Sequence, residues 1–334
     1  MPGANALKRL RWVVDIEAWR PSEDEWNFYL RQVPLQEQEA VLKFKKEDDR
    51  KRALVSRLLQ RCAYCTVLGL PATSLNICRT KGRKPFLRGA PDPATGRDLA
   101  PEARQRAQAP NFNLNISHEG ALVVLASEPV CLVGVDVAAP WHQRPGISQR
   151  GHGASALRAT FEKQLTEQEW RSVEAAGSPS EQEVMFQTLW SLKEAFVKAR
   201  GDGLAFDFHR ASFRPRVPVG RNGAPGTCAC LPWTGPVEVE VDGVLRSDWA
   251  LHVAHPRCGY AISVARGPPT EARDAWGVFR GTFLRPELSP EELEAHLGAE
   301  EPAFTELRVE DLLPEGAGRP ERRNDNNVGI MDNH

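Results

Sequence analysis

The sequence lacks a strong net charge, a long apolar run and a secretory leader. Its 43 Lys and Arg residues nearly balance 44 Asp and Glu residues, and the formal net charge is −1. Overall charge therefore gives no reason to expect nucleic acid or an acidic membrane as a partner. No run approaches the roughly 20 apolar residues of a membrane helix, and the first ten residues hold no apolar segment typical of a signal peptide. An anionic ligand would need a local cluster of cations.

Two common nucleotide-binding motifs and a complete zinc motif are also missing. No Gly-x-x-x-x-Gly-Lys-Ser/Thr occurs, and no Gly-x-Gly-x-x-Gly follows a predicted strand. Cys62-x-x-Cys65 lies in a helical pattern without a second half at zinc-ligand spacing, so core packing is the better interpretation. Seven cysteines spread along a long chain favour reduced thiols, and we expect the cytosol, with an organellar address left open.

The pattern of apolar residues predicts a mixed α+β protein. The chain has 334 residues, 41% hydrophobic and 26% charged, which is typical of a globular protein with room for two domains. Strands are predicted at 10–16, 75–80, 111–118, 121–127, 132–137, 205–213, 237–244, 249–254 and 260–264, and helices at 23–33, 36–44, 49–68, 156–161, 166–176 and 180–200. Loops are predicted at 88–109, 142–155 and 214–236, with a disordered tail from about 314.

An internal echo suggests that the chain contains two similar halves. A strand followed by an acid occurs at 13–19 and again at 134–141, and each is followed by helices, a long helix closing on Gly-Leu, and more strands. We therefore predict a pseudo-twofold pair of α+β halves, at 8–130 and 131–266. Residues 267–334 form a C-terminal extension that we expect to be partly disordered.

A basic turn is predicted at 79–85, where four of six successive residues are cations: Arg79, Lys81, Arg83 and Lys84. Guanidinium groups bind phosphate bidentately, an ammonium acts as a point charge, and Gly82 lets the backbone approach a ligand. A basic hairpin in solvent would have the same composition.

The strand at 111–118 ends on Asn115, Ser117, His118 and Glu119, followed by a glycine. Adjacent residues of a strand point to opposite faces, so Ser117 and His118 do not form a catalytic pair by spacing alone. Hydrogen bonding to an anion is the more plausible function. A histidine at a strand end has a structural explanation at least as often.

Two acids on separate elements suggest a metal–phosphate site. Asp136 ends an apolar strand, where a carboxylate is costly unless it is paired or bound to a cation. Glu194 and Lys198 lie four residues apart on one helix face, which fits a surface ion pair as well as a metal ligand beside a phosphate-binding lysine. Magnesium takes one or two carboxylates together with phosphates and water. Both interpretations remain open at this point.

Taken in order, these segments resemble the Sfp-type 4′-phosphopantetheinyl transferases, especially the eukaryotic members that serve aminoadipate-semialdehyde dehydrogenase and fatty-acid synthases. The resemblance covers about 10–266 and leaves out the loops at 88–109 and 214–236 and the tail beyond 267. The matching segments are Arg79-Thr80-x-Gly82-Arg83-Lys84-Pro85, Asn115-Ile116-Ser117-His118, Gly134-Val135-Asp136-Val137, Trp190-Ser191-Leu192-Lys193-Glu194-Ala195-Phe196-Val197-Lys198-Ala199 and the Gly-Asp-Gly-Leu at 201–204.

The resemblance implies a pseudo-twofold fold with the active site between the halves. It also implies magnesium-dependent transfer of phosphopantetheine from coenzyme A to a serine of an apo acyl or peptidyl carrier protein, releasing 3′,5′-ADP. Asp136 and Glu194 become the magnesium ligands, Glu194 helps to deprotonate the serine, and Lys198 meets the departing phosphate. The residues expected to bind coenzyme A are Arg79, Lys81, Arg83, Lys84, Asn115, Ser117, His118 and Lys193.

The chain departs from the family pattern at two places. Many bacterial members have Asp-x-Glu where this chain has Asp136 and Ala138, and we expect Glu119 to serve as the third metal ligand instead. The arginine that precedes the long N-terminal helix aligns near Ala40, and Lys43, Lys45 or Lys46 could replace it. The alternative to a monomeric enzyme is a non-catalytic scaffold that binds coenzyme A or a carrier protein. The sequence does not identify the carrier.

Overall fold

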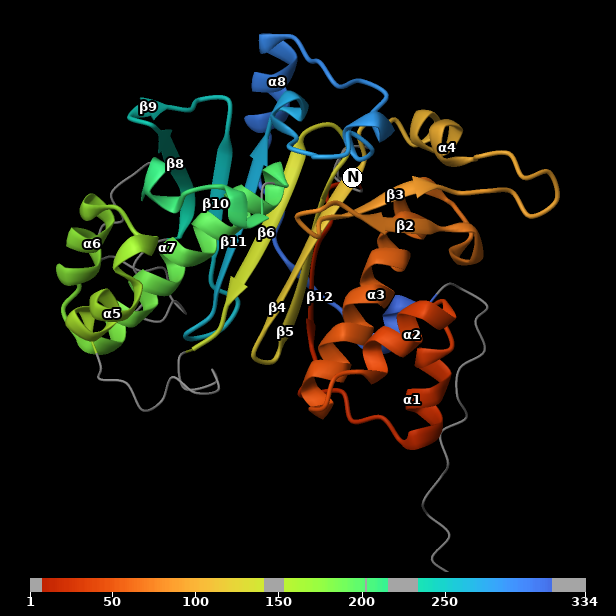
Figure 1. The fold of residues 1–334 in the computed structure, drawn as a ribbon, viewed down its shortest axis with the longest axis horizontal. Helices are drawn as coiled ribbons and strands as arrows, with labels where there is room; N and C mark the ends of the chain where they lie inside the picture. Colours follow the sequence, from red (N-terminus) through yellow and green to blue (C-terminus); the bar gives the residue numbers. More distant parts are fainter. Residues whose placement is uncertain (1–7, 141–152, 202, 216–233, 314–334) are drawn as a thin grey trace, which may run out of the picture.

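The computed structural model describes residues 8–140, 153–201, 203–215 and 234–313, and Figure 1 shows their helices arranged around two large sheets. The mixed α+β class is confirmed. The loop predicted at 142–155 and the insertion predicted at 214–236 lie largely outside the described residues, and the tail from 314 lies outside them entirely. Within the described ranges, no helix is both long and apolar enough to cross a bilayer.

The elements follow the predicted order with some additions. The α-helices are α1 Glu23–Leu30, α2 Leu35–Leu42, α3 Glu47–Leu68, α4 Ala100–Arg106, α5 Ala154–Phe161, α6 Glu167–Glu174, α7 Pro179–Arg200 and α8 Pro290–Leu297. The strands are β1 Arg11–Asp15, β2 Asn76–Arg79, β3 Pro85–Gly89, β4 Asn113–Glu119, β5 Leu122–Glu128, β6 Leu132–Ala138, β7 Ala211–Pro215, β8 Gly235–Val241, β9 Val244–Leu245, β10 Ala250–Ala254, β11 Ala261–Gly267 and β12 Thr305–Glu306.

Local sequence signals determine where the helices begin and end. Ser22 caps α1 in a capping box with Glu25, and Thr166 caps α6 in the same way with Glu169. The two longest helices, α3 and α7, each have 22 residues and end on a left-handed glycine, Gly69 and Gly201. The helix starts and stops predicted at these positions are confirmed.

The first sheet has the order β12-β1-β5-β4, with β5 antiparallel to both β1 and β4. Helix α3 covers one face, where its buried Leu54, Leu58 and Tyr64 join Phe112 and Leu114 of the sheet in one apolar core. Figure 1 shows α1 and α2 on the same side as α3. The core between α3 and the first sheet therefore supports β4 from one face.

The second sheet has the order β6-β11-β10-β8-β7, with β9 beside β8. Helix α7 packs across this sheet through the buried Phe186, Leu189 and Phe196, and α5 and α6 cover α7 from outside (Figure 1). The opposite face of the second sheet meets the first through buried valines that include Val124, Val135 and Val264. The two sheets are therefore held together by an apolar layer.

Side chains of β4 also bond directly to the backbone of β6. The amide oxygen of Asn113 accepts a hydrogen bond from Val133 N–H at 3.1 Å, and that of Asn115 accepts one from Val135 N–H at 3.0 Å. The constant offset of 20 residues means that β4 and β6 run parallel and in register. We call these contacts the β4–β6 side-chain ladder.

Three predictions about irregular segments were wrong. The loop predicted at 88–109 contains α4, whose Ala100, Ala103 and Arg104 are buried. The strand predicted at 205–213 is two 3₁₀ turns, and the strand β7 begins only at Ala211. Pro85, the last residue of the predicted basic turn, is the first residue of β3. In each case, packing against distant parts of the chain outweighed a weak local pattern.

The C-terminal extension contributes ordered structure to both sheets. Strand β12 pairs with β1 in parallel, with Trp12 opposite Thr305. The buried carboxylate of Glu301 pairs with Arg11 of β1 and with Arg266 of β11, at 3.1 Å from the latter, and Arg9 lies at 3.5 Å. Glu301 therefore ties the first sheet to the second.

Substitution Glu301→Gln should lower the free energy of unfolding by roughly 3–5 kcal/mol, because it leaves buried arginines with only Glu128 as a counterion. Burial acts to raise the pKa of Glu301, but the charges of Arg11, Arg266 and Arg9 outweigh it and lower the pKa. The carboxylate therefore stabilises the fold above about pH 4.5 and less as the pH falls through its depressed pKa.

Urea unfolding at several pH values tests this, with Glu294→Gln on the exposed face of α8 as the control. The difference in the free energy of unfolding between the parent and Glu301→Gln should become smaller as the pH falls below about 4.5. Equal stability of Glu301→Gln and Glu294→Gln at pH 7 would contradict the assigned role.

Candidate functional site

Three side chains from β4, β6 and α7 meet at one point. The hydroxyl of Ser117 donates to Asp136 Oδ1 at 2.8 Å, and Lys198 Nζ donates to Ser117 Oγ at 3.1 Å. Lys198 also forms an ion pair with the same Asp136 oxygen. The structure thus brings together three of the residues singled out in the sequence, from positions up to 81 residues apart.

A glycine in β6 lets α7 approach this point. A Cβ atom on Gly134 would lie 2.0 Å from Ala195 O and 2.4 Å from Ala199 N, so only glycine fits between the strand and the helix. A glycine inside an apolar strand is a recognised signal for such close approach. The contact holds the last turns of α7, and with them Lys198, directly over Asp136.

Glu194 lies one turn before Lys198 and is half-buried. Burial, followed by the negative charge of Asp136, raises the pKa of Glu194, while Lys198 acts in the opposite direction. Among the described residues, Lys198 pairs with Asp136 and forms no ion pair with Glu194. The interpretation of Glu194 and Lys198 as an ordinary surface pair therefore does not hold, and two carboxylates share one site.

A hollow of about 660 Å³ opens beside these groups. Glu194 and Lys198 line one part of it, and the basic turn between β2 and β3 lines another. Three aromatic side chains, Trp190, Phe206 and Phe208, form an apolar part of the wall, and the two phenylalanines were not anticipated from the sequence. Polar side chains line much of the rest, among them Lys163, Gln164 and Asp207. A hollow of this size that combines an aromatic surface with charged groups suits a small organic ligand that carries charge.

Arg79 and Arg83 form a basic rim at the part of the hollow lined by the turn. Both are exposed, and Arg79 donates to the carbonyl of Arg83 at 3.2 Å. Arg83 has a φ of +68°, uncommon for a residue other than glycine. Partial desolvation and the neighbouring charge of Arg57 lower the pKa of Arg79. Crowded cations of this kind favour an anionic ligand such as phosphate.

The other two cations of the turn have different surroundings. Lys81 does not line this hollow but an adjoining one of about 710 Å³, beside Arg273. Lys84 is only 2% exposed, and its ammonium donates to the carbonyls of Val133 and Lys198. Burial lowers the pKa of Lys84 to about 7. The expectation that Lys84 binds phosphate is not supported by these contacts, because both acceptors are protein carbonyls.

Lys193 and Asn115 also have structural partners. Lys193 is completely buried, and its ammonium lies 2.8 Å from Glu169 and donates to the carbonyls of Phe208 and Ala211. It does not line the hollow, so these contacts give no support to the expectation that it binds a ligand. Asn115 borders the hollow, but its amide oxygen belongs to the β4–β6 side-chain ladder.

His118 lies on the other face of β4 from Ser117. Partial desolvation, followed by the charges of Arg52 on α3 and Lys198, lowers the pKa of His118, although the side chain remains exposed. In the register of β4 and β5, Ser117 lies opposite Val124 of the core between the sheets and His118 opposite Val123 of the core under α3, which confirms that the two side chains point to opposite faces. His118 is therefore a neutral hydrogen-bonding group at neutral pH.

Asp136 and Glu194 are the two carboxylates available for a divalent cation. The third expected ligand, Glu119, accepts a hydrogen bond from Ala139 N–H at 2.7 Å. Within the described ranges, no group of three or more His, Cys, Asp or Glu side chains is close enough to hold a metal. The three-carboxylate arrangement expected from the sequence is thus not formed. The lysines at 43, 45 and 46 are exposed and do not line the hollow.

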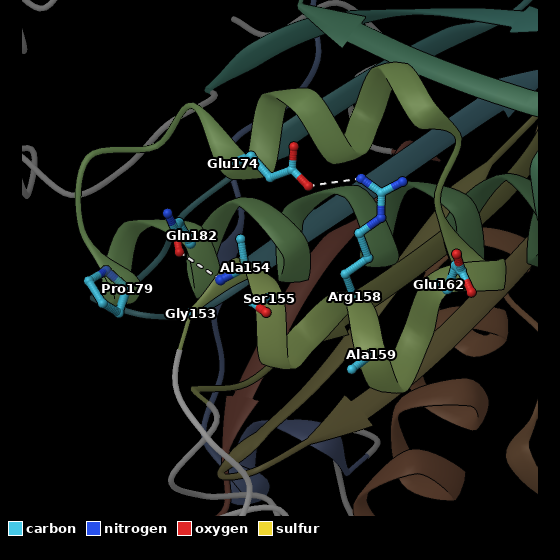
Figure 2. A pocket seen from close by; sticks show the side chains of 9 residues that line it. All are labelled: Gly153, Ala154, Ser155, Arg158, Ala159, Glu162, Glu174, Pro179 and Gln182. Atoms are coloured by element: carbon cyan, nitrogen blue, oxygen red, sulfur yellow. Dashed lines mark hydrogen bonds and ion pairs between the residues drawn. The ribbon is translucent and has the colours of Figure 1, made fainter.

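A second hollow, of about 710 Å³, lies away from these residues. It is bordered by α5, α6 and the start of α7, and Figure 2 shows Arg158 in it pointing toward Glu174. Arg158 is paired with Glu174 at 2.9 Å and with Glu167, so its charge is already balanced. None of the residues predicted to carry chemistry lines this hollow.

Comparison with known proteins finds similarity along most of the described chain. Residues 17–130 match the family model described as 4′-phosphopantetheinyl transferase, N-terminal, and residues 132–224 match that of the 4′-phosphopantetheinyl transferase superfamily. Both models carry the same activity in their descriptions. The C-terminal extension lies outside both matched regions.

Several curated proteins are similar to the chain. It is 33% identical over 217 residues to the L-aminoadipate-semialdehyde dehydrogenase-phosphopantetheinyl transferase of Xenopus laevis, covering 63% of this chain and 64% of that protein. The Homo sapiens protein of the same name is 31% identical over 208 residues, covering 62% and 61%. A phosphopantetheinyl transferase of Thraustochytrium is 32% identical over 208 residues, covering 60% and 64%. The chain thus spans less than two thirds of the length of these relatives.

Substitution Lys193→Met should destabilise the protein by roughly 3–5 kcal/mol, because it leaves the buried carboxylate of Glu169 without a counterion. The double variant Lys193→Met with Glu169→Gln should recover part of that loss, since no buried charge remains and the amide oxygen can still accept from Phe213 N–H. Thermal and urea unfolding measure both. A stable Lys193→Met protein with impaired ligand binding would instead show that Lys193 contributes to ligand binding.

Proposed function

The chain belongs to the 4′-phosphopantetheinyl transferase superfamily, and we propose that it transfers 4′-phosphopantetheine from coenzyme A to a serine of an apo carrier protein. The serine oxygen forms a bond to the phosphorus that bears pantetheine, the pyrophosphate bond to that phosphorus breaks, and 3′,5′-ADP leaves. The observation that carries the proposal is the joint placement of Asp136, Glu194 and Lys198 beside a hollow with a basic rim.

Glu194 and Lys198 would handle the proton and the charge of this reaction. The raised pKa of Glu194 makes it a better proton acceptor for the serine hydroxyl than an ordinary carboxylate. Lys198, whose ammonium lies next to Asp136 and Ser117, would neutralise the charge that develops on the departing phosphate. Positioning and charge neutralisation supply most of the catalysis in phosphoryl transfer.

Arg79 and Arg83 would bind the phosphates of coenzyme A, because they border the hollow and their mutual repulsion is relieved by an anion. His118 would add a neutral hydrogen-bonding group, and Ser117 a hydroxyl beside Lys198. The aromatic wall formed by Trp190 and Phe208 would cover the less polar parts of the ligand and exclude water.

The carboxylates of Asp136 and Glu194 fit a magnesium ion. Magnesium takes one or two carboxylates together with substrate phosphates, and a cation would offset the burial and the repulsion from Asp136 that together raise the pKa of Glu194. Bound there, it would supply charge neutralisation of the pyrophosphate. Glu119 is held by Ala139 N–H and is not required for a two-carboxylate site.

We also propose that the halves at 8–130 and 131–266 are related by a pseudo-twofold axis. In support, α3 and α7 have equal lengths, end on left-handed glycines and each cover one sheet. We further propose that the protein is a monomer and that it acts in the cytosol on carrier proteins.

Incubation with apo carrier proteins, coenzyme A and magnesium should give a phosphopantetheine adduct, detected as a mass increase of the carrier. Asp136→Ala and Glu194→Ala should lower the rate at least about 100-fold, because each removes a group that acts on the reacting phosphate. Glu119→Gln should retain part of the activity.

Glu174→Ala, in the hollow of Figure 2, is the matched control and should leave the rate unchanged. Activity of Glu194→Ala close to that of the parent would contradict the assignment. Binding of coenzyme A without an adduct on any of several carriers would identify a non-catalytic scaffold instead.

A further inference from the structure

We propose that Phe279, on the C-terminal extension, is a positioning residue for the coenzyme-binding turn and acts through the buried ammonium of Lys84. This rests on the proposed function for the identity of the ligand. Neither matched family region reaches beyond residue 224, so the extension is a feature that family membership does not explain.

The extension packs against β3 and β6, two strands next to the site. Phe279 and Phe283 form a separate apolar cluster with Phe86 of β3 and Leu132 of β6. The ring centroids of Phe279 and Phe86 are 5.8 Å apart, and those of Phe279 and Phe283 are 4.9 Å apart. Strand β3 follows directly after the basic turn, so this cluster fixes one end of the turn.

Lys84 connects the turn to the two elements that carry the reacting groups. Its ammonium donates to the carbonyl of Val133 on β6 and to the carbonyl of Lys198 on α7, the latter at 3.3 Å. The ring of Phe279 lies 5.6 Å from this ammonium. Among the described residues no carboxylate pairs with Lys84, so the two carbonyls and the aromatic face are its only favourable neighbours.

The backbone holds Phe279 in this position. Asp274 accepts hydrogen bonds from the N–H groups of Trp276 and Phe279 and closes a short loop that leads to the ring. Next to it, Arg273 N–H donates to Arg200 O at 2.7 Å, at the end of α7. The extension is thus anchored to α7 before it reaches Lys84.

Glycines allow close contact between three segments, which are the basic turn, the end of α7 and the extension. A Cβ on Gly82 of the turn would lie 2.4 Å from Gly201 O, and a Cβ on Gly201 would lie 2.8 Å from Arg273 O. The turn therefore touches the end of α7, and the end of α7 touches the extension, with no side chain between them. These close backbone contacts hold the turn next to the extension, so that the Phe279 ring can lie over the Lys84 ammonium.

Loss of the Phe279 ring should therefore loosen the turn and weaken binding of the coenzyme more than it slows the chemical step. Phe279→Leu keeps an apolar side chain but removes the aromatic face, and it should raise the Kd for 3′,5′-ADP roughly tenfold. The KM for coenzyme A should rise in parallel, with a smaller change in kcat. Phe279→Trp, which restores an aromatic face, should recover most of the affinity.

The matched control is Phe283→Leu, which alters the same apolar cluster but not the ring over Lys84. It should change stability to a similar extent and the Kd by less than about twofold. The decisive measurement is a double-mutant cycle with Lys84→Met. If Phe279 acts through the ammonium, Phe279→Leu should have little further effect on the Kd in the Lys84→Met background.

Equal effects of Phe279→Leu in both backgrounds, or equal Kd values for Phe279→Leu and Phe283→Leu, would overturn the proposal. Should the parent bind neither coenzyme A nor 3′,5′-ADP, the proposed function fails, but the positioning role can still be measured. Amide hydrogen exchange at Thr80 and Arg83, whose N–H groups close the turn, should accelerate in Phe279→Leu and not in Phe283→Leu. Unchanged exchange in Phe279→Leu would also overturn it.

Discussion

A row of side chains on β4 replaces the backbone hydrogen bonds that would otherwise join β4 to β6. Asn113, Asn115 and Glu119 accept from N–H groups of the neighbouring strand, and Ser117 donates to Asp136 in the same row. Buried polar groups are stabilising only when all of them have partners, and a satisfied network is rigid and specific. Because the strands are held in register in this way, Asp136 is fixed opposite Ser117, and the candidate site is built on that contact.

Helix α7 adds the remaining groups in a fixed orientation. Lys193 is held in the core by Glu169, and successive helical residues point about 100° apart. With Lys193 anchored inside, Glu194 is turned toward the hollow, and Lys198 follows it one turn later. The buried pair thus sets the rotation of the helix, while Gly134 sets its distance from β6. A residue named in the family motif can therefore be essential to the site without touching a ligand.

Signals confined to a few residues were sufficient to predict much of the fold. The capping residues Ser22 and Thr166 and the terminal glycines of α3 and α7 marked helix ends correctly, because such caps depend on neighbouring backbone groups alone. The placement of Lys84 and Lys193 could not be predicted in this way, since their partners lie far away in the sequence. Three buried asparagines alternate through the apolar strand at 111–115. Because buried amides require hydrogen-bond partners, this pattern indicates a neighbouring element such as β6, which the sequence prediction did not include. Asp136, Ser117 and Lys198, singled out in the sequence, lie in direct contact, whereas Glu119 accepts a hydrogen bond from Ala139 N–H.

The pairing of β12 with β1 joins the two ends of the described chain. Trp12 lies opposite Thr305, so one edge of the first sheet closes only after nearly the whole chain has been made. Contacts between residues so far apart in sequence slow folding, because the intervening chain must first be ordered. During synthesis, Arg9 and Arg11 have Glu128 as a partner first, and their second carboxylate, Glu301, is added only near the end of the described chain. A prematurely terminated chain therefore lacks β12, the last strand of its first sheet. The edge of β1 that β12 covers is then open, and an open strand edge favours aggregation.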